Sequence, residues 1–527
     1  MDTPPILMQK KNRKSAWGLI VWFVILIPVY YILYKLYIPK VSAFGCFDDC
    51  FNYVGGYFLG KGKQLYSQIY FNHMPLMAYL SYLVQHYGNP INIYALLLQH
   101  RQFLLVFGFI FNVFLCWRFG ITGLAYTLIY EFSKFYVFGD RFLAESFIVY
   151  PLVYLTGLGL HTMLKKRVYD WEIVLAAICL WFVVFMREPY VPVAVFLFGL
   201  FIRPVFFKKI SLIALGVFLT LSAGLLALFP VRDFVYNVIT LNVERGLSSE
   251  LQAGNFFGSG IIKSFFYPVY LLIAGKWNDF RIQLIILSIV LGFSAVVWVK
   301  TKKNLRVLGF LFIALGLANL RPTAPGLQYF EAFHEINWYG VFLFSSLYLL
   351  YESMRGARKR YIFFIITGCL VAYVLFSPRS FIYQHVDQQT EFITNYGNYL
   401  QISEIIKAIT TPQQTLFTNG ADEFLYLASD RNSSYPYSFY YPTQFKDKYY
   451  TAATNMFSRN PPDIVYDFCS PEAPVHPYIP AQFLNLYTQW YSEGKPTCLY
   501  MKKSLVPGLT QRQRAKAGEF LYYLPEK

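Results

Sequence analysis

Long apolar blocks, each close to the length of a membrane-spanning helix, recur along this 527-residue chain. A helix needs about 20 predominantly apolar residues to cross a bilayer. Only 14% of the residues are charged, whereas a soluble domain usually carries about a quarter. The sequence therefore excludes a soluble globular enzyme and predicts a polytopic α-helical membrane protein with about eleven spans. The predicted spans are 17–34, 102–117, 119–138, 142–163, 171–186, 190–206, 210–230, 282–299, 305–319, 336–352 and 361–376.

The basic residues set the predicted orientation of these spans. Membrane proteins concentrate Lys and Arg in their cytoplasmic loops, and every basic cluster in a short loop here falls on the side of the N-terminus. We therefore expect a multi-pass protein of the cell membrane with a cytoplasmic N-terminus. The same distribution explains nearly all of the net charge of +17, so no nucleic-acid partner is required. The clusters are Lys10, Lys11, Arg13 and Lys14; Arg118; Lys165, Lys166 and Arg167; Lys208 and Lys209; Lys300, Lys302 and Lys303; and Arg355, Arg358, Lys359 and Arg360.

This topology divides the chain into a membrane domain, residues 1–376, and an extracytoplasmic domain, residues 377–527. The segment Ile261–Ala274 is apolar enough to cross, but a crossing would place the basic cluster that begins at Lys300 outside. We therefore expect an interfacial or re-entrant element there. The outer segments are 39–101, 139–141, 187–189, 231–281, 320–335 and the C-terminal domain.

The C-terminal region has the pattern of a small α/β domain. Short runs rich in β-branched and aromatic residues predict strands, and longer runs between them predict helices. The expected strands are Thr415–Thr418, Asp463–Phe468 and Leu499–Lys502, and the expected helices are Leu400–Ile409 and Phe483–Tyr491.

Two adjacent carboxylates, Asp48 and Asp49, stand just beyond the first span. Because like charges repel, we expect one of the pair to keep a raised pKa and to serve as a general base. The alternative is a solvated pair, or a cap for the helix-like stretch Cys50–Leu59.

The acid pair belongs to a longer pattern. It is followed by Gly55-Gly56-Tyr57-Phe58-Leu59-Gly60 and then by Asn72-His73-Met74-Pro75-Leu76. This order resembles the first extracytoplasmic loop of GT-C superfamily membrane glycosyltransferases, in the branch of protein O-mannosyltransferases and aminoarabinose transferase-like enzymes. In that family an Asp-Glu pair follows the first span, and a His-Lys-Pro-Pro-Leu-like segment comes later. Here His73 stands where many relatives place a lysine, and Phe51 where some place a basic residue.

The resemblance implies an activity and its residues. Such enzymes move a sugar from a polyprenyl-phosphate donor to a glycan, lipid or protein acceptor on the outer membrane face. Asp48 falls at the family's catalytic acid and Asp49 at its companion. A single displacement with Asp48 as general base would invert the anomeric centre.

The donor phosphate needs cations, and the predicted outer segments offer several. The further substrate-binding candidates are His73, Glu145, Arg187, Lys263, Arg321 and His334.

Each of these candidates has a structural alternative. An arginine at the end of a span often extends to water as an anchor, and Glu145 at the start of a span complements a helix N-terminus. His334 either lines the pocket or pairs with Glu331 or Glu335. Glu131 and Lys134 are spaced to pair on one helical turn, and we interpret that pair as structural.

No DxD motif accompanies the acid pair, so we predict a reaction without a metal cofactor, although a divalent cation is not excluded. Four cysteines lie in outer segments, where conditions are oxidising. Cys469–Cys498 and Cys46–Cys50 are the candidate disulfides, and the second would constrain the acid pair.

The main competing interpretation is a transporter or flippase of lipid-linked sugars. Such proteins commonly show internal repeats and ionisable residues near the bilayer midplane. This sequence has no evident repeat, and its charges lie mostly at the ends of the spans. An O-antigen-type ligase would lack an early acid pair. A non-catalytic scaffold stays open as a further alternative.

Overall fold

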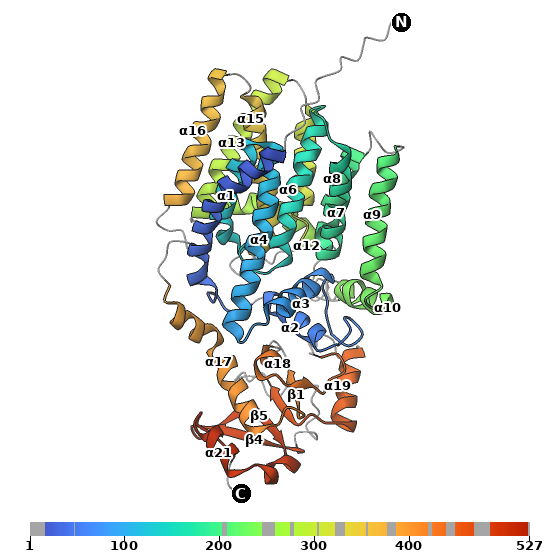
Figure 1. Ribbon diagram of the computed structural model, residues 1–527, viewed down its shortest axis with the longest axis vertical. Coiled ribbons are helices and arrows are strands. Elements are labelled where there is room, and N and C mark those ends of the chain that lie inside the picture. Colours follow the sequence, from blue (N-terminus) through green and yellow to red (C-terminus); the bar gives the residue numbers. More distant parts are fainter. Residues whose placement is uncertain are drawn as a thin grey trace.

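The computed structural model describes residues 16–46, 48–202, 208–244, 259–274, 279–302, 305–321, 332–354, 357–376, 386–419, 424–438, 448–467 and 485–524. Helices form a bundle at one end of the molecule, and a domain with a β-sheet lies at the other (Figure 1). Helices α2 (Asp48–Gly60) and α3 (Leu76–Gly88) lie between these two parts. Both belong to the predicted first outer loop, which is therefore where the bundle and the domain meet.

Within the described residues, five helices are long and apolar enough to cross a membrane. Two of them, α1 and α9, expose large hydrophobic side chains such as Ile25 and Leu219 on the outside of the bundle. Such a surface is stable when lipid covers it, which is consistent with the predicted membrane protein. The five helices are α1 (Ala16–Tyr37), α4 (Ile93–Phe119), α6 (Ala144–Met163), α9 (Lys209–Leu226) and α13 (Asp279–Lys302).

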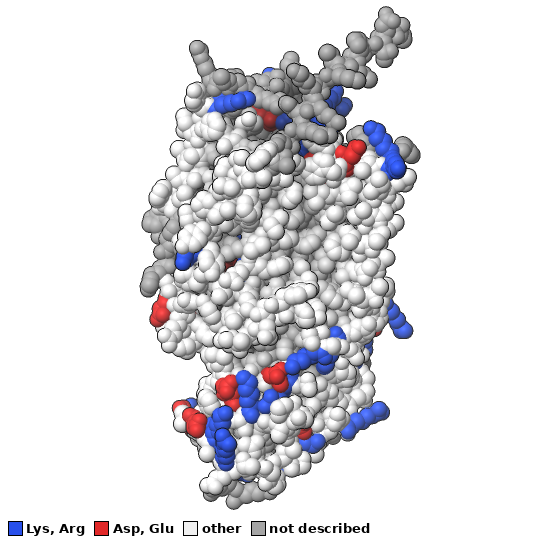
Figure 2. Space-filling view, viewed as in Figure 1, with Lys and Arg blue, Asp and Glu red and all other residues white. Residues whose placement is uncertain are grey.

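Each of the eleven predicted spans contains a helix, although the number that cross a bilayer stays a prediction. Figure 2 shows an almost uncharged surface over the bundle, between charged side chains at its far end and on the C-terminal domain. The segment expected to be interfacial or re-entrant is the helix α12 (Ser259–Ala274). The remaining helices of the bundle are α5 (Ile121–Ser133), α7 (Asp170–Met186), α8 (Val191–Ile202), α14 (Leu305–Leu317), α15 (Ile336–Ser353) and α16 (Ala357–Phe376).

Helix α15 lies in the interior of the bundle. Nearly all of its side chains are buried, and it packs against α5, α6 and α13. The contact with α6 depends on Gly340, because a Cβ atom at this position would clash with the side chain of Val149. Small residues allow this close approach of helices inside a membrane.

A buried ion pair joins three helices of the bundle. Glu131 of α5 and Lys134, which begins the short helix η2 (Lys134–Val137), lie 2.7 Å apart with neither side chain exposed. The predicted pairing is therefore confirmed. Asn112 of α4 and Tyr150 of α6 each donate a hydrogen bond of 2.8 Å to Glu131 Oε1. These contacts compensate the charges inside an apolar bundle, as buried ions require.

The C-terminal domain contains a six-stranded mixed sheet with the order β2-β1-β3-β5-β4-β6. Leu416 pairs with Ile464 in the parallel half, and Val465 pairs with Tyr500 in the antiparallel half. The predicted α/β domain is thus present. The strands are β1 (Thr415–Asn419), β2 (Asn432–Ser433), β3 (Ile464–Asp467), β4 (Tyr487–Ser492), β5 (Lys495–Lys502) and β6 (Tyr522–Tyr523), and the helices are α17 (Gln388–Ile409), α18 (Phe424–Ser429), α19 (Lys448–Arg459) and α21 (Gln511–Gly518).

The prediction of a helix over Phe483–Tyr491 is wrong where the structure describes this segment. Strand β4 occupies its end and forms a hairpin with β5. Glu493 and Gly494 connect the two strands, and both have positive φ, as the central residues of a type I′ turn do. The dipeptide Glu493-Gly494 is the feature of the sequence that could have predicted this hairpin.

The C-terminal domain docks onto the first outer loop through hydrogen bonds. Lys61 and Tyr57, at the end of α2, donate to Asp430 Oδ1 at 2.8 and 2.9 Å. The backbone amide of Tyr70 donates to the carbonyl of Tyr437 at 2.8 Å. The C-terminal domain therefore holds the first outer loop, which carries Asp48 and His73, both at the end of α2 and at Tyr70.

The buried pair predicts a large effect of removing one charge. We expect Glu131→Gln to lower the free energy of unfolding by about 3–5 kcal/mol, because it leaves Lys134 buried without its counter-charge. The double variant Glu131→Gln/Lys134→Met should recover most of the loss. Thermal unfolding of the purified protein in detergent, followed by tryptophan fluorescence, measures both.

Glu404→Gln is the matched control, because Glu404 and Lys407 pair at 2.8 Å with the same sequence spacing but are 45% and 37% exposed. An exposed pair contributes little. Equal melting temperatures for Glu131→Gln and Glu404→Gln would contradict the structural role of the buried pair.

Candidate active site

Asp48 and Asp49 occupy the first turn of α2, where carboxylates complement the helix dipole. Successive residues of a helix point about 100° apart, so the two side chains face different surroundings. The Asp48 side chain is 41% exposed, whereas the Asp49 side chain is fully buried. The acid pair is therefore two separate groups with separate partners.

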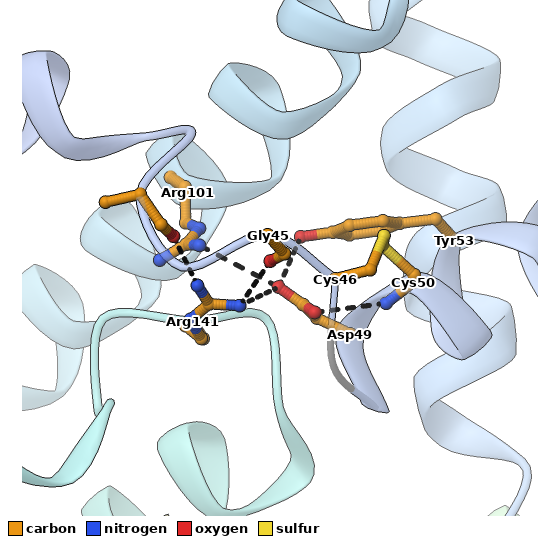
Figure 3. The surroundings of a disulfide bond; sticks show 8 residues. Gly45, Cys46, Asp49, Cys50, Tyr53, Arg101 and Arg141 are labelled. Atoms are coloured by element: carbon orange, nitrogen blue, oxygen red, sulfur yellow. Dashed lines mark hydrogen bonds and ion pairs between the residues drawn. A yellow bond between two sulfur atoms is a disulfide. The ribbon is translucent and has the colours of Figure 1, made fainter. Parts of the chain in front are cut away.

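Asp49 is surrounded by cations and donors (Figure 3). Its Oδ2 atom lies 3.4 Å from Arg141 Nη1 and 3.7 Å from Arg101 Nη2. The Tyr53 hydroxyl donates to the same oxygen at 3.4 Å, and the Cys50 amide donates to Oδ1 at 3.1 Å. Asp49 thus fixes the N-terminus of α2 to the bundle and is too deeply buried to contact a substrate.

A disulfide adds a covalent constraint at the same position. Cys46 and Cys50 are bonded across Asp48 and Asp49, with their Cα atoms 5.5 Å apart, as Figure 3 shows. Cys498 is also disulfide-bonded, while Cys469 lies outside the described residues. The candidate Cys46–Cys50 bridge is therefore present and limits the directions that the Asp48 side chain can take.

Asp48 faces a cluster of basic side chains from other elements. Its Oδ2 atom accepts a hydrogen bond of 3.4 Å from Arg321 Nη2 and lies 3.6 Å from Arg187 Nη2 and 4.0 Å from His73 Nε2. Arg187 ends α7, and Arg321 follows α14. One carboxylate oxygen therefore receives all three contacts.

Glu145, in the first turn of α6, holds the two arginines from the buried side. Arg321 Nη1 donates to Glu145 Oε1, and Arg187 Nε lies 3.8 Å from the same oxygen. The Glu145 side chain is only 2% exposed. The guanidinium group of Arg321 also lies over the ring of Phe333, 4.7 Å from its centroid. These contacts orient both arginines toward Asp48.

The loop that carries His73 is held by other outer segments. Tyr66 donates to the His73 carbonyl at 2.9 Å, and Asn242 donates to the Asn72 carbonyl at 2.8 Å. The ring of Phe51 lies against the imidazole with centroids 5.1 Å apart. His73 therefore reaches Asp48 through a fixed loop, and Phe51 supplies an aromatic wall beside its imidazole.

Burial and the charge of Arg187 lower the pKa of His73 well below its ordinary value, against the opposing effect of Asp48. The imidazole is therefore neutral at neutral pH. Burial raises the pKa of Asp48, but His73, Arg187 and Arg321 lower it by more, so its net direction is downward. Arg187 and Arg321 carry permanent charges that keep Asp48 ionised. The expected rise in the pKa of one member of the pair is wrong for Asp48, because cations rather than Asp49 face it.

The structure brings five of the eight predicted site residues together. Arg187 is bound to carboxylates inside the site, so the alternative of an anchor extending to water is wrong. Asp49 lies beside this cluster with partners of its own. The five are Asp48, His73, Glu145, Arg187 and Arg321.

Of the two remaining predicted residues, His334 has contacts with Phe333 and Tyr190, and the side chain of Lys263 lies outside the described residues. The ring of His334 packs on Phe333 at 4.5 Å, and its carbonyl accepts a hydrogen bond from Tyr190 at 3.3 Å. Its predicted alternative pairing with Glu335 is wrong, because neither carboxylate oxygen of Glu335 has a hydrogen-bond partner among the described residues. The side chain of Lys263 and all of Glu331 lie outside the described part of the chain.

Sequence reasoning missed the residues that hold the acid pair in place. Arg101 binds Asp49 and also Asp140, whose Oδ2 atom lies 2.5 Å from Arg101 Nη1. Arg141 donates to the Gly45 carbonyl at 2.9 Å as well as to Asp49. Two features of the sequence could have indicated these residues. Arg101 is a charge at the very end of a predicted span, and Asp140-Arg141 is a charged dipeptide in a very short predicted outer loop.

Comparison of the chain with protein-family models, with curated proteins and with solved structures finds no match. The function must therefore be inferred from the geometry. The arginines Arg187 and Arg321 can bind an oxyanion. The half-exposed carboxylate of Asp48, which they face, can accept a proton. In the described part of the chain, no group of three His, Cys, Asp or Glu side chains could hold a metal ion.

Glu335, next to His334, predicts a pH-dependent stability. Burial raises the pKa of Glu335 to about 8, from 4.5. The folded state therefore holds this proton more tightly than the unfolded state does, and stability falls by up to about 1.4 kcal/mol per pH unit as the pH rises through this interval. Glu335→Gln removes the titrating group, so we expect its melting temperature to depend less on pH than that of the wild type.

Thermal unfolding in detergent between pH 4.5 and 9 tests this expectation. Glu519→Gln, at an exposed carboxylate of the C-terminal domain, is the control and should follow the wild type. Parallel curves for wild type and Glu335→Gln would show that Glu335 has an ordinary pKa.

Proposed function

We propose that this chain is a membrane glycosyltransferase of the GT-C type, which moves a sugar from a polyprenyl-phosphate donor to an acceptor hydroxyl on the outer membrane face. The observation that carries the proposal is the half-exposed carboxylate of Asp48, which faces Arg187 and Arg321 at 3.6 and 3.4 Å. The first-loop pattern around Asp48 and His73 supports the same activity by its resemblance to that family.

The proposal includes eleven spans, a cytoplasmic N-terminus and an extracytoplasmic C-terminal domain. Two sets of ion pairs support it, because each joins segments that the topology places on one side. Lys166 pairs with Glu352 at 2.6 Å, and Arg118 pairs with Glu172, on the proposed cytoplasmic side. Asp48 and its partners join the ends of other helices on the opposite side.

In the proposed reaction, Arg187 and Arg321 bind the donor phosphate, and Asp48 accepts the proton of the acceptor hydroxyl. The hydroxyl oxygen forms a bond to the anomeric carbon as the bond between that carbon and the phosphate oxygen breaks. The electron pair of the broken bond stays on the phosphate, whose growing charge the arginines stabilise. This single displacement inverts the anomeric centre.

The remaining residues of the site have supporting roles. Asp49 fixes the start of α2 and thereby positions Asp48, and Glu145 positions the two arginines. His73 contributes a neutral hydrogen-bonding group beside the donor phosphate. Because the arginines supply the positive charge that the leaving phosphate needs, a divalent cation has no role in this step.

Labelling of introduced cysteines tests the proposed topology. In intact cells that express the protein, we expect a membrane-impermeant maleimide to label Glu519→Cys but not Lys209→Cys, because the two positions lie on opposite sides. Permeabilised cells should show labelling at both positions, which controls for accessibility. Labelling of Lys209→Cys in intact cells would contradict the orientation.

Transfer from defined polyprenyl-phosphate sugars by the purified protein tests the activity. We expect Asp48→Asn to lower the transfer rate by about 100-fold or more, the usual contribution of a general base. Glu404→Gln is the matched control, since Glu404 is an exposed carboxylate of the C-terminal domain that also pairs with a lysine. Full activity of Asp48→Asn would refute the proposed base, and no transfer by wild type from any donor would favour a transporter of lipid-linked sugars.

A further inference from the structure

The contacts of Asp48 are those of an anion held in an oxyanion site. Its Oδ2 atom is the common target of Arg187 Nη2 and Arg321 Nη2. The Asp48 side chain is 41% exposed, whereas those of Arg187 and Arg321 are 9% and 10% exposed. The carboxylate therefore covers the accessible side of two otherwise buried guanidinium groups.

Arg321 is anchored independently of Asp48. Glu145 contacts Arg321 Nη1 and Arg187 Nε, which are different nitrogen atoms from those that face Asp48. Phe333 supports the guanidinium plane of Arg321. If Asp48 moved away, Arg321 would keep these contacts, and its Nη2 atom would stay in place beside Arg187.

The contacts between Asp48 and the arginines are long. Charge-assisted N–H···O bonds are usually about 2.7–2.9 Å, whereas these distances are 3.4 and 3.6 Å. A phosphate offers several oxygens and matches guanidinium groups with paired hydrogen bonds. It would therefore bind the same nitrogen atoms better than the Asp48 carboxylate does.

We propose that the donor phosphate displaces Asp48 from Arg187 and Arg321, so that Asp48 is released to act as the base only when a donor is bound. This inference rests on the proposed transferase function. Without a donor, the carboxylate is held by the arginines and is a poor proton acceptor. With a donor, the phosphate neutralises the arginines, and the pKa values of both Asp48 and His73 rise. Donor binding and base activation are thus one event.

The groups around Asp48 determine this response. Helices α3 and α18 pack against α2, but α18 has no charged residue, and α3 has only His86 in its last turn. The charged and titratable groups that act on Asp48 or its arginines, among the described residues, are His73, Glu145, Arg187, Tyr190, Arg321 and Glu188, in addition to the neighbouring Asp49.

The affinity for farnesyl phosphate, which carries the phosphate but no sugar, tests the competition. We expect Asp48→Asn to bind this probe about tenfold more tightly than wild type, within the usual range of coupling between competing groups, because its amide no longer occupies the arginines as an anion. Glu404→Gln, at an exposed carboxylate of the C-terminal domain, should bind like wild type. Isothermal titration of the full-length protein in detergent measures the constants, and Asp48→Ser replaces Asp48→Asn if that variant does not fold. An unchanged or weaker affinity would overturn the proposal.

Because loss of a nearby negative charge alone also favours anion binding, a second measurement follows His73. In protein labelled with ¹³C in its seven histidines, the His73 resonance is assigned with His73→Asn. We expect farnesyl phosphate to raise the pKa of His73 by at least about one unit, a tenfold change in proton affinity, and farnesol to leave it unchanged. Binding of farnesyl phosphate without this rise, no binding, or an equal rise with farnesol would each overturn the exchange.

The two proposals fail in different ways. A protein that shows the His73 response but transfers no sugar retains the phosphate exchange and loses the transferase function. A protein that transfers sugar without the response retains the function and loses only the exchange.

Discussion

The burial of one carboxylate, Asp49, determines how the outer end of this molecule is assembled. An ionised carboxylate is stable in an apolar interior only when cations and donors surround it. Here the cations come from two places in the helical bundle: Arg101 belongs to α4, and Arg141 to the short connection before α6. A single buried charge therefore joins three segments, and the Cys46–Cys50 disulfide closes the chain around it. The first outer loop is fixed to the bundle at this point, which gives Asp48 a defined direction.

A second buried carboxylate is also paired with two arginines, but here the arginines face a further carboxylate nearer the surface. Glu145 is the buried carboxylate, Arg187 and Arg321 are the cations it holds, and Asp48 is the exposed carboxylate that they face. Charge alternates from the interior to the surface, so each group is compensated by the next. Only the outermost group can be replaced by a ligand without leaving a buried charge unpaired. The proposed phosphate site lies at the position of this group.

The helices of the bundle and most of the candidate site could be predicted because both depend on local properties of the sequence. Apolar length alone located the helices, and the alternation of basic loops grouped Arg187, Arg321 and Glu145 on the side of Asp48. Three features depended on contacts between distant segments. Arg101 was missed because nothing in linear order relates it to Asp49, and β4 was predicted as a helix because its hairpin partner decides its conformation. The lowered pKa of Asp48 follows from His73 and from two arginines that are more than 100 residues away in the sequence.

Adjacent carboxylates in one helix turn are often interpreted as a coupled pair that shares a proton, and the geometry here argues against that interpretation. Residues next to each other on a helix diverge by about 100°, so Asp48 and Asp49 need not approach one another. Each instead meets its own pair of arginines, and their exposures of 41% and 0% assign them different tasks. Repulsion between the two carboxylates is then a minor influence on either one. In the proposed mechanism, the occupancy of Arg187 and Arg321 controls the reactivity of Asp48, so a ligand that binds those arginines acts on Asp48 without having to touch it.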